Sequence, residues 1–117
     1  MNQVVLSGRV IGEPRSFDKE NSVNKFAVVK LATIKAGYIN QQGQAVPARE
    51  LYHRICTFNK RAEFAMSLHS GDYIIVTGEL NYSQRQDEYG STTQTTEIFA
   101  TNIEKVTNNV VNTAENV

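Results

Sequence analysis

The chain begins with two segments in which apolar side chains recur at every second position, residues 4–11 and 25–34. A period of two places alternate side chains on opposite faces of an extended strand, so both segments are predicted to be β-strands with one apolar face. The side chains predicted to share the apolar faces are Val4, Leu6, Val10, Ala27, Val29 and Leu31. Gly8 falls on the same face, where a glycine lets a strand bend or another backbone approach.

Three later segments continue the strand pattern, at residues 51–58, 73–80 and 95–106. Between the first two of these, residues 60–68 change to apolar positions three and four residues apart, which predicts a short helix. Asn59 directly precedes this segment and is a residue type that favours the N-cap position.

Polar segments connect the predicted strands. Residues 35–49 contain two Gly and three Gln, which predicts a long loop or flexible hairpin, and long loops often carry function. Residues 81–93 are polar as well, with a predicted hairpin tip at residues 87–90. Residues 107–117 show no useful pattern, and we expect a flexible tail there.

The predicted order is strand, strand, strand, helix, strand, strand. An all-β chain with one short helix between its third and fourth strands matches the OB-fold, a five-stranded Greek-key barrel of a kind that binds oligonucleotides. Gly8 and Gly78 on the inward faces fit the sharp coiling that a small barrel requires. An SH3-like barrel is the main alternative, although it has no helix at this place. We therefore expect one OB-fold domain over residues 1–106.

Composition excludes several classes of protein. The 117 residues suffice for one core, and 40% hydrophobic and 21% charged residues are typical of a globular chain. No apolar run reaches the roughly 18–20 residues of a membrane helix. The N-terminal residues do not resemble a secretory signal, so we expect a cytoplasmic protein without a membrane partner. Cys56 is the only cysteine, which excludes an internal disulfide and a cysteine-based zinc site.

Charge is balanced overall but unevenly distributed. The chain has 12 basic and 12 acidic residues, and this balance alone argues mildly against a polyanionic partner. Residues 1–61 contain ten basic and four acidic side chains, a net charge of +6, and residues 62–117 carry −6. The asymmetry suggests a positive surface built from the first half of the fold, with chance as the alternative explanation.

The third predicted strand combines aromatic and basic side chains on one face, which Tyr52, Arg54 and Phe58 share with Cys56. A protein that binds single strands without sequence preference needs rings on which bases stack and cations along the phosphate backbone. Alternation does not decide which face of the strand is inside, so a core position explains Phe58 equally well.

No residues have the spacing of a catalytic or metal-binding site. His53 and Cys56 are three apart on a strand and therefore point to opposite faces. The chain lacks a glycine-rich phosphate loop and a Gly-x-Ser-x-Gly motif, and its acidic residues are scattered. We expect neither an enzyme nor a protein with a cofactor or metal ion.

Five segments together resemble the bacterial-type single-stranded DNA-binding proteins, with primosomal replication protein B, a relative with the same fold, as the nearest alternative family. The similarity covers roughly residues 1–105. The segments are residues 2–14 (NQVVLSGRVIGEP), 27–33 (AVVKLAT), 52–60 (YHRICTFNK), 71–80 (GDYIIVTGEL) and 95–98 (TTEI).

The resemblance implies a protein that coats and protects single-stranded DNA in replication, recombination and repair, in the cytoplasm at the nucleoid. It implies that Tyr52 and Phe58 face the DNA and that His53 lies at a subunit interface of a homotetramer, with a dimer as the alternative. The residues expected to contact DNA are Arg9, Lys30, Lys35, Tyr38, Arg49, Tyr52, Arg54, Phe58, Lys60 and Arg85. For Arg9, Lys30 and Tyr38, an ordinary surface position is the alternative.

Three features depart from the family pattern, and the balanced net charge with the sparsely charged segment 81–86 favours a second hypothesis. The chain has no tryptophan, and Arg85 is the only charged residue of segment 81–86, in the place of a family aromatic. The sequence ends in TAENV without the acidic, phenylalanine-containing tip with which the family recruits other proteins. The second hypothesis is an OB-fold protein-interaction module, such as a primosome accessory, that binds DNA weakly.

Overall fold

A computed structural model of the chain describes residues 1–17, 25–107 and 110–113. Its long strands are β1 (Val4–Ser16), β2 (Phe26–Lys35), β5 (Arg49–Phe58), β6 (Tyr73–Gln86) and β7 (Thr92–Thr107). The remaining elements are the short strands β3 (Tyr38–Ile39), β4 (Ala45–Val46) and β8 (Val110–Thr113) and the helix α1 (Lys60–Met66). No helix among these described residues is long and apolar enough to cross a membrane.

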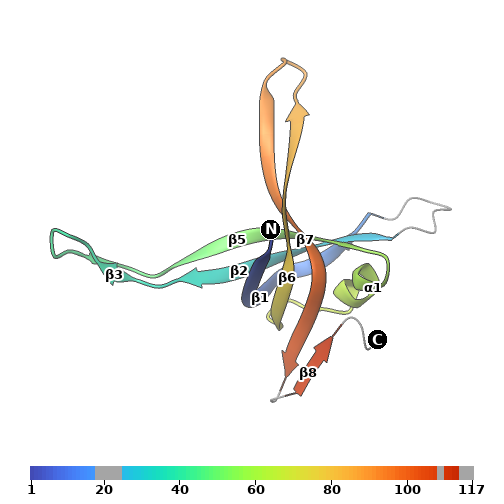
Figure 1. Ribbon diagram of the computed structural model, residues 1–117, viewed down its shortest axis with the longest axis horizontal. Coiled ribbons are helices and arrows are strands. Elements are labelled where there is room, and N and C mark those ends of the chain that lie inside the picture. The colour runs from blue at the N-terminus through green and yellow to red at the C-terminus, as the bar shows by residue number, and fades with distance from the viewer. Residues whose placement is uncertain (18–24, 108–109, 114–117) are drawn as a thin grey trace.

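The long strands close into a barrel (Figure 1). They follow the order β5-β2-β1-β6-β7, and β8 adds to the outer edge of β7. A parallel pairing of β5 with β7, in which Ile55 lies opposite Ile98 and Cys56 opposite Phe99, closes the circle. The helix lies between the third and fourth long strands, so the predicted OB-fold is confirmed.

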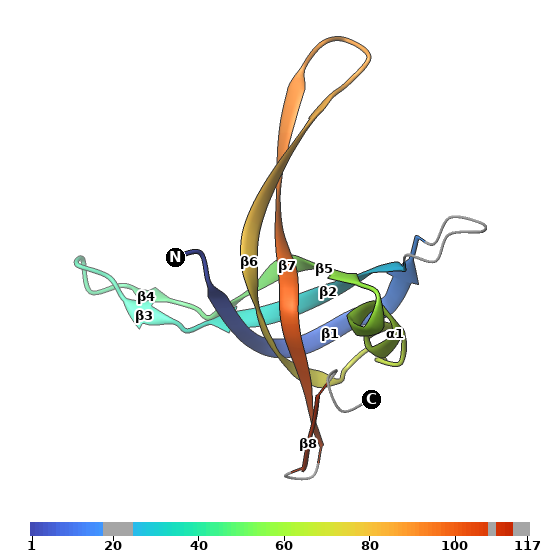
Figure 2. The same cartoon turned by 45° about the vertical axis from the view of Figure 1, so that its right-hand side comes forward.

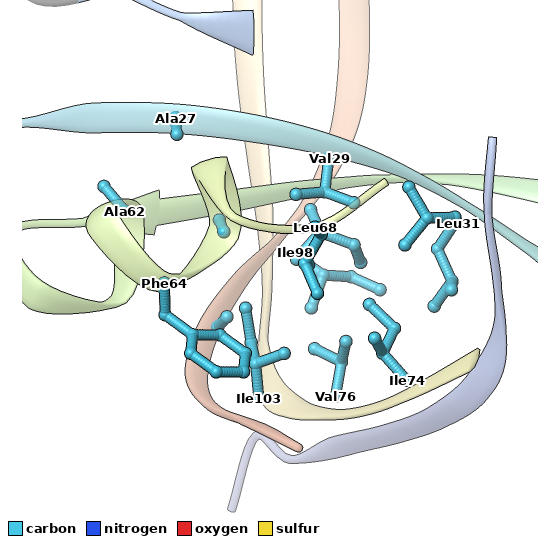
Figure 3. Close-up of a cluster of buried hydrophobic side chains, with 14 residues drawn as sticks. Ala27, Val29, Leu31, Ala62, Phe64, Leu68, Ile74, Val76, Ile98 and Ile103 are labelled. Atoms are coloured by element: carbon cyan, nitrogen blue, oxygen red, sulfur yellow. The ribbon is translucent and has the colours of Figure 1, made fainter. Parts of the chain in front are cut away.

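The core fills the barrel and continues under α1 (Figure 3). The predicted apolar face of β2 is confirmed, because Ala27, Val29 and Leu31 are all buried. Val4 and Leu6 of β1 pack against the same cluster while partly exposed. The other buried members are Val10, Ile55, Ala62, Phe64, Ala65, Leu68, Ile74, Val76, Ile98, Ala100 and Ile103.

Two glycines permit the barrel to close tightly. A Cβ atom on Gly8 would lie 1.9 Å from the carbonyl oxygen of Ala32 on β2. A Cβ atom on Gly78 would lie 2.4 Å from the carbonyl oxygen of Phe99 on β7. Both positions therefore require glycine because a neighbouring backbone occupies the space of a side chain, as the sequence pattern predicts.

Asn59 precedes the helix but does not cap it with its side chain. Its backbone has φ 56° and ψ −121°, and no side-chain hydrogen bond reaches the first turn of α1. The side-chain Oδ1 instead accepts from the backbone N–H of Lys25 at 3.4 Å, and the Asn59 N–H donates to the Lys25 carbonyl at 2.9 Å. The residue thus ties the start of α1 to the start of β2.

Two hairpin arms project from the barrel in different directions (Figures 1 and 2). Residues 35–49 form the predicted hairpin, with β3 and β4 paired near its end. The polar residues 81–93 extend β6 and β7 beyond the expected strand ends, and the turn at residues 87–90 is confirmed. A ribbon exposed on both sides has no apolar face, so alternation could not predict these strand extensions.

The segment expected to be a flexible tail contains regular structure. Residues 110–113 form β8, which pairs antiparallel with residues 104–107 of β7. Residues 108–109 and 114–117 of the expected tail lie outside the described residues.

Candidate nucleic-acid interface

The pairing of β2 with β5 places most of the expected DNA-contacting side chains on one surface. In this antiparallel pair Ala32 lies opposite Tyr52, Lys30 opposite Arg54, Val28 opposite Cys56 and Phe26 opposite Phe58. Directly opposed residues share a face of the sheet. The β2 residues of these pairs alternate along the strand with the core residues of β2. Their side chains and those of their β5 partners therefore lie on the outer face of the barrel. We call it the β2–β5 face, defined by Lys30, Tyr52, Arg54 and Phe58.

Lys30 and Tyr52 form one end of the β2–β5 face. The Lys30 Nζ lies 4.8 Å from the centroid of the Tyr52 ring, a cation–π contact. The Tyr52 hydroxyl donates to Glu50 Oε2 at 2.6 Å, and this bond raises the pKa of Tyr52 above its ordinary value. Because Tyr52 is still 56% exposed, its ring combines a fixed orientation with a surface open to solvent.

A groove of about 560 Å³ runs beside Tyr52. Its walls come from β1, β2 and β5 and include Arg15, Lys30, Tyr52 and Arg54. The volume is within the range of small-ligand sites. Arg15 is a cation that was not among the residues expected from the sequence. Its position follows from the register of β1 with β2, in which Arg15 lies opposite Val28.

Glu97 of β7 lies beside Arg54 and is the carboxylate of the surface that sequence reasoning missed. Arg54 Nε donates to Glu97 Oε2 at 2.8 Å, and the Cys56 thiol donates to the same oxygen at 3.2 Å. The Ser83 hydroxyl donates to Oε1 at 3.1 Å. The Glu97 side chain is only 12% exposed. Three side chains, two from β5 and one from β6, thereby share the Glu97 carboxylate.

The electrostatics of this cluster follow from its hydrogen bonds. The bond from Arg54 lowers the pKa of Glu97, against an opposing effect of burial. The same bond raises the pKa of Arg54. Burial, with the neighbouring Glu97, raises the pKa of the Cys56 thiol to about 12. Arg54 and Glu97 are therefore both charged at neutral pH, and Cys56 is a neutral thiol.

Phe58 lies at the other end of the β2–β5 face. It is 43% exposed, so the open question of its position is settled in favour of the outer face and against the core. Its ring centroid lies 5.1 Å from that of Phe26 and 5.4 Å from that of Phe99. Phe17 continues the row, 5.7 Å from Phe26. Phe17, Phe26 and Phe99 are not among the residues expected from the sequence, although Phe26 has the same parity in its strand as Lys30.

A second group of expected residues meets at the base of the β3–β4 arm. Lys35 at the end of β2 lies opposite Arg49 at the start of β5. Both residues and Tyr38 line a small pocket of about 150 Å³ with Val46 and Pro47. The expected loop residues are therefore adjacent in space, at one end of the strand pair that carries the β2–β5 face.

Three expected residues lie apart from both the β2–β5 face and the cluster at the base of the β3–β4 arm. Arg9 of β1 donates from Nη1 to the Gly71 carbonyl at 2.8 Å, and its guanidinium lies 5.7 Å from the Tyr73 ring centroid. Lys60 begins α1 and is exposed. Arg85 lies on the β6–β7 arm opposite Thr93.

His53 points away from Tyr52, because neighbouring strand residues alternate. It is partly buried, with Nε2 2.8 Å from the Thr33 hydroxyl oxygen, and burial lowers the pKa of His53. Within the described ranges of the chain, no cluster of three or more His, Cys, Asp and Glu side chains could hold a metal ion.

Comparisons with known proteins give one family. The model of the single-strand binding protein family matches residues 1–106. A curated single-stranded DNA-binding protein of Bacteroides thetaiotaomicron is 33% identical over 116 residues, which covers 97% of this chain and 70% of the relative.

Two solved structures share the fold at lower identity. A deletion mutant of the single-stranded DNA-binding protein from Thermus aquaticus matches with a TM-score of 0.76 and 24% identity. The match covers 92% of this chain and 51% of that chain, so this chain spans about half its length. A Plasmodium falciparum SSB complex with ssDNA matches with a TM-score of 0.74 and 23% identity over 85% of both chains. Since the family model spans nearly the whole chain, the resemblance seen in the sequence is confirmed: this chain belongs to the single-strand binding protein family.

Proposed function

We propose that the chain binds single-stranded DNA without sequence preference on the β2–β5 face and protects it during replication, recombination and repair. The observation that carries this proposal is the order of side chains on that face. The exposed rings of Tyr52 and Phe58 lie at the two ends of the face, and the Lys30–Arg54 pair lies between them. Stacking of a base on such a ring contributes about 1–3 kcal/mol and tolerates every base. The family is one of DNA-binding proteins and not of enzymes, which agrees with this function.

The bound strand would follow β2 and β5 towards the β3–β4 arm. From Phe58 it passes the Lys30–Arg54 pair and Tyr52 and reaches the cluster of Lys35, Tyr38 and Arg49. This path alternates rings with cations, as a non-specific single-strand groove requires. With DNA as the ligand, we propose a location in the cytoplasm at the nucleoid.

An anisotropy titration with labelled oligo-dT at about 20 and 200 mM salt, with duplex DNA as the comparison, tests the proposal. We expect tight binding of oligo-dT, weak binding of duplex and a modest salt dependence. The double variant Tyr52→Ala/Phe58→Ala should weaken binding at least tenfold, since two stacks are lost. Tyr89→Ala is the control, because Tyr89 is 86% exposed at the tip of the β6–β7 arm.

Two results would contradict the proposal. Unchanged affinity of the double variant would show that the two rings do not stack on bases. Absence of oligo-dT binding at low salt would instead favour the protein-interaction module, whose barrel serves assembly.

We also propose that the protein assembles as a homotetramer, with a dimer as the alternative. In support, Val5 and Ile11 of β1 and Ile34 of β2 are exposed apolar side chains on the outside of the barrel. Ile11 and Ile34 line a groove of about 440 Å³ there together with polar side chains such as Arg9 and Glu50, and exposed apolar side chains with a polar rim are typical of interaction sites. Several grooves on one DNA strand raise the avidity of binding through effective concentration.

Light scattering after size exclusion tests the assembly. Ile34→Glu should lower the measured mass, because it places a charge in the apolar surface, while Ile39→Glu on the exposed β3–β4 arm should not. A monomeric wild-type protein would refute the proposal. His53→Ala then tests whether the partly buried imidazole lies at the interface.

A further inference from the structure

The ion pair between Arg54 and Glu97 stands in the middle of the proposed DNA surface. Arg54 Nε lies 2.8 Å from Glu97 Oε2, and the Cys56 thiol and Ser83 hydroxyl hold the same carboxylate in place. Glu97 is 12% exposed, whereas the Arg54 side chain is 40% exposed. The carboxylate is thus the fixed partner, and the guanidinium remains open to a ligand.

The two cations of the β2–β5 face therefore differ in their electrostatic surroundings. Within the described part of the chain, Lys30 has no ion pair, and its ammonium group contacts the Tyr52 ring. Arg54 has a carboxylate partner of opposite charge, and the pair has no net charge. A cation releases counterions from DNA only when its charge neutralises a phosphate, and each such contact on a single strand adds about 0.7 to the salt slope of log K.

We propose that Glu97 is a positioning residue that orients Arg54 and cancels its charge, so that Arg54 lies against bases and not against phosphates. The proposal rests on the binding function proposed above. A guanidinium is planar and stacks on flat rings, so it can contact a base without a free charge. Lys30, in contrast, is left to neutralise phosphate. Glu97 thereby limits the salt dependence of binding at the centre of the face.

The substitution Glu97→Gln tests this role because it removes the charge and preserves the shape. The amide oxygen can accept from Arg54 and Cys56 as Oε2 does, and the amide nitrogen can donate to the Ser83 hydroxyl. The control is Glu104→Gln, which removes one negative charge at the position on β7 opposite Ile75. The double variant Glu97→Gln/Arg54→Gln removes both charges of the pair. Thermal unfolding of each variant checks that it is folded.

The measurement is the affinity for oligo-dT from about 20 to 200 mM salt. We expect Glu97→Gln to steepen the slope by about 0.7, which is about a fivefold larger loss of affinity over this tenfold range of salt. The double variant and the Glu104→Gln control should keep the wild-type slope. A double variant with a slope shallower by about 0.7 would overturn the proposal, because Arg54 would then neutralise a phosphate beside Glu97. Equal slopes of Glu97→Gln and the control would overturn it as well.

Failure of the binding function gives a different result. If the wild-type protein does not bind oligo-dT at low salt, both the proposed function and the proposed role of Glu97 are refuted. If it binds and only the predicted slopes are wrong, the binding function stands and the role of Glu97 alone is refuted.

Discussion

Gly8 shows at the scale of one residue how the barrel restricts its sequence. A methyl group there would overlap the Ala32 carbonyl oxygen, 1.9 Å away, and backbone atoms of a paired strand cannot easily retreat. We expect Gly8→Ala to cost about 3 kcal/mol or more, at or above the upper end of the range typical of overpacking, measured by urea unfolding. Gly43→Ala is the comparison, since its Cβ would meet open space and only the φ of 76° opposes it, at about 1–2 kcal/mol. Equal losses in the two variants would contradict the packing explanation.

Two carboxylates make stability depend on pH. The bond from Arg54 lowers the pKa of Glu97, and the backbone N–H of His69, 2.8 Å from Oδ2, lowers that of Asp72. A carboxyl group whose pKa is lower in the folded state stabilises the fold above its unfolded pKa, and this stabilisation is lost as pH falls through the folded pKa. We expect the free energy of unfolding to fall below about pH 5.

Urea unfolding at pH 7 and pH 4 measures this loss. Glu97→Gln and Asp72→Asn should each make stability less sensitive to acid, because neither side chain can then take up a proton. A variant that keeps the full wild-type difference between the two pH values would show that its carboxylate is not responsible.

The two arms differ at the scale of elements. The strands β3 and β4 pair only with each other, so the barrel does not depend on the end of this arm. Replacement of residues 36–48 by Asn-Gly should leave the circular dichroism spectrum and cooperative unfolding in place. It removes Tyr38, and the loss of one stack should weaken oligo-dT binding by about 1–3 kcal/mol.

Shortening of the β6–β7 arm is the matched comparison. Replacement of residues 85–93 by Asn-Gly removes Arg85 and no part of the β2–β5 face. We expect a smaller loss of affinity than for the β3–β4 arm. A larger loss would mean that the DNA strand follows β6 and β7.

At the scale of the whole molecule, the neutral net charge conceals a separation of charge. Residues 1–61, which carry a net charge of +6, include β1 to β5 and with them the groove and the Lys35–Arg49 cluster. We expect the triple variant Lys30→Gln/Lys35→Gln/Arg49→Gln to lower the salt slope of oligo-dT binding by about 2, at about 0.7 for each phosphate contact. Lys105→Gln is the control, because Lys105 on β7 lies 3.4 Å from Asp72. An unchanged slope of the triple variant would exclude these cations from the DNA path.

The amino-acid sequence by itself determined the five long strands, the helix between the third and fourth of them and the order that specifies the OB-fold, but not the short strand β8 in the segment expected to be a tail. Period-two alternation is a local property, because the steric alternation of an extended backbone acts between nearest neighbours. The same local information placed Tyr52, Arg54 and Phe58 on one face and Gly8 and Gly78 on the apolar faces of their strands. Where no face is buried, as in the arm formed by residues 81–93, the signal disappeared and the strand ends were misplaced.

Only the tertiary structure decided which face of β5 is outside and which side chains meet there. Phe58 is exposed because β5 turns Ile55 and Thr57 inward when the barrel closes. Arg54 meets Glu97, 43 residues away in sequence, because the closing pair of β5 and β7 is parallel and sets Ile55 opposite Ile98. Arg9, in contrast, donates a hydrogen bond to the Gly71 carbonyl and lies apart from the β2–β5 face. Barrel closure and strand register depend on contacts between residues far apart in the sequence, and a pattern of period two contains no information about such contacts.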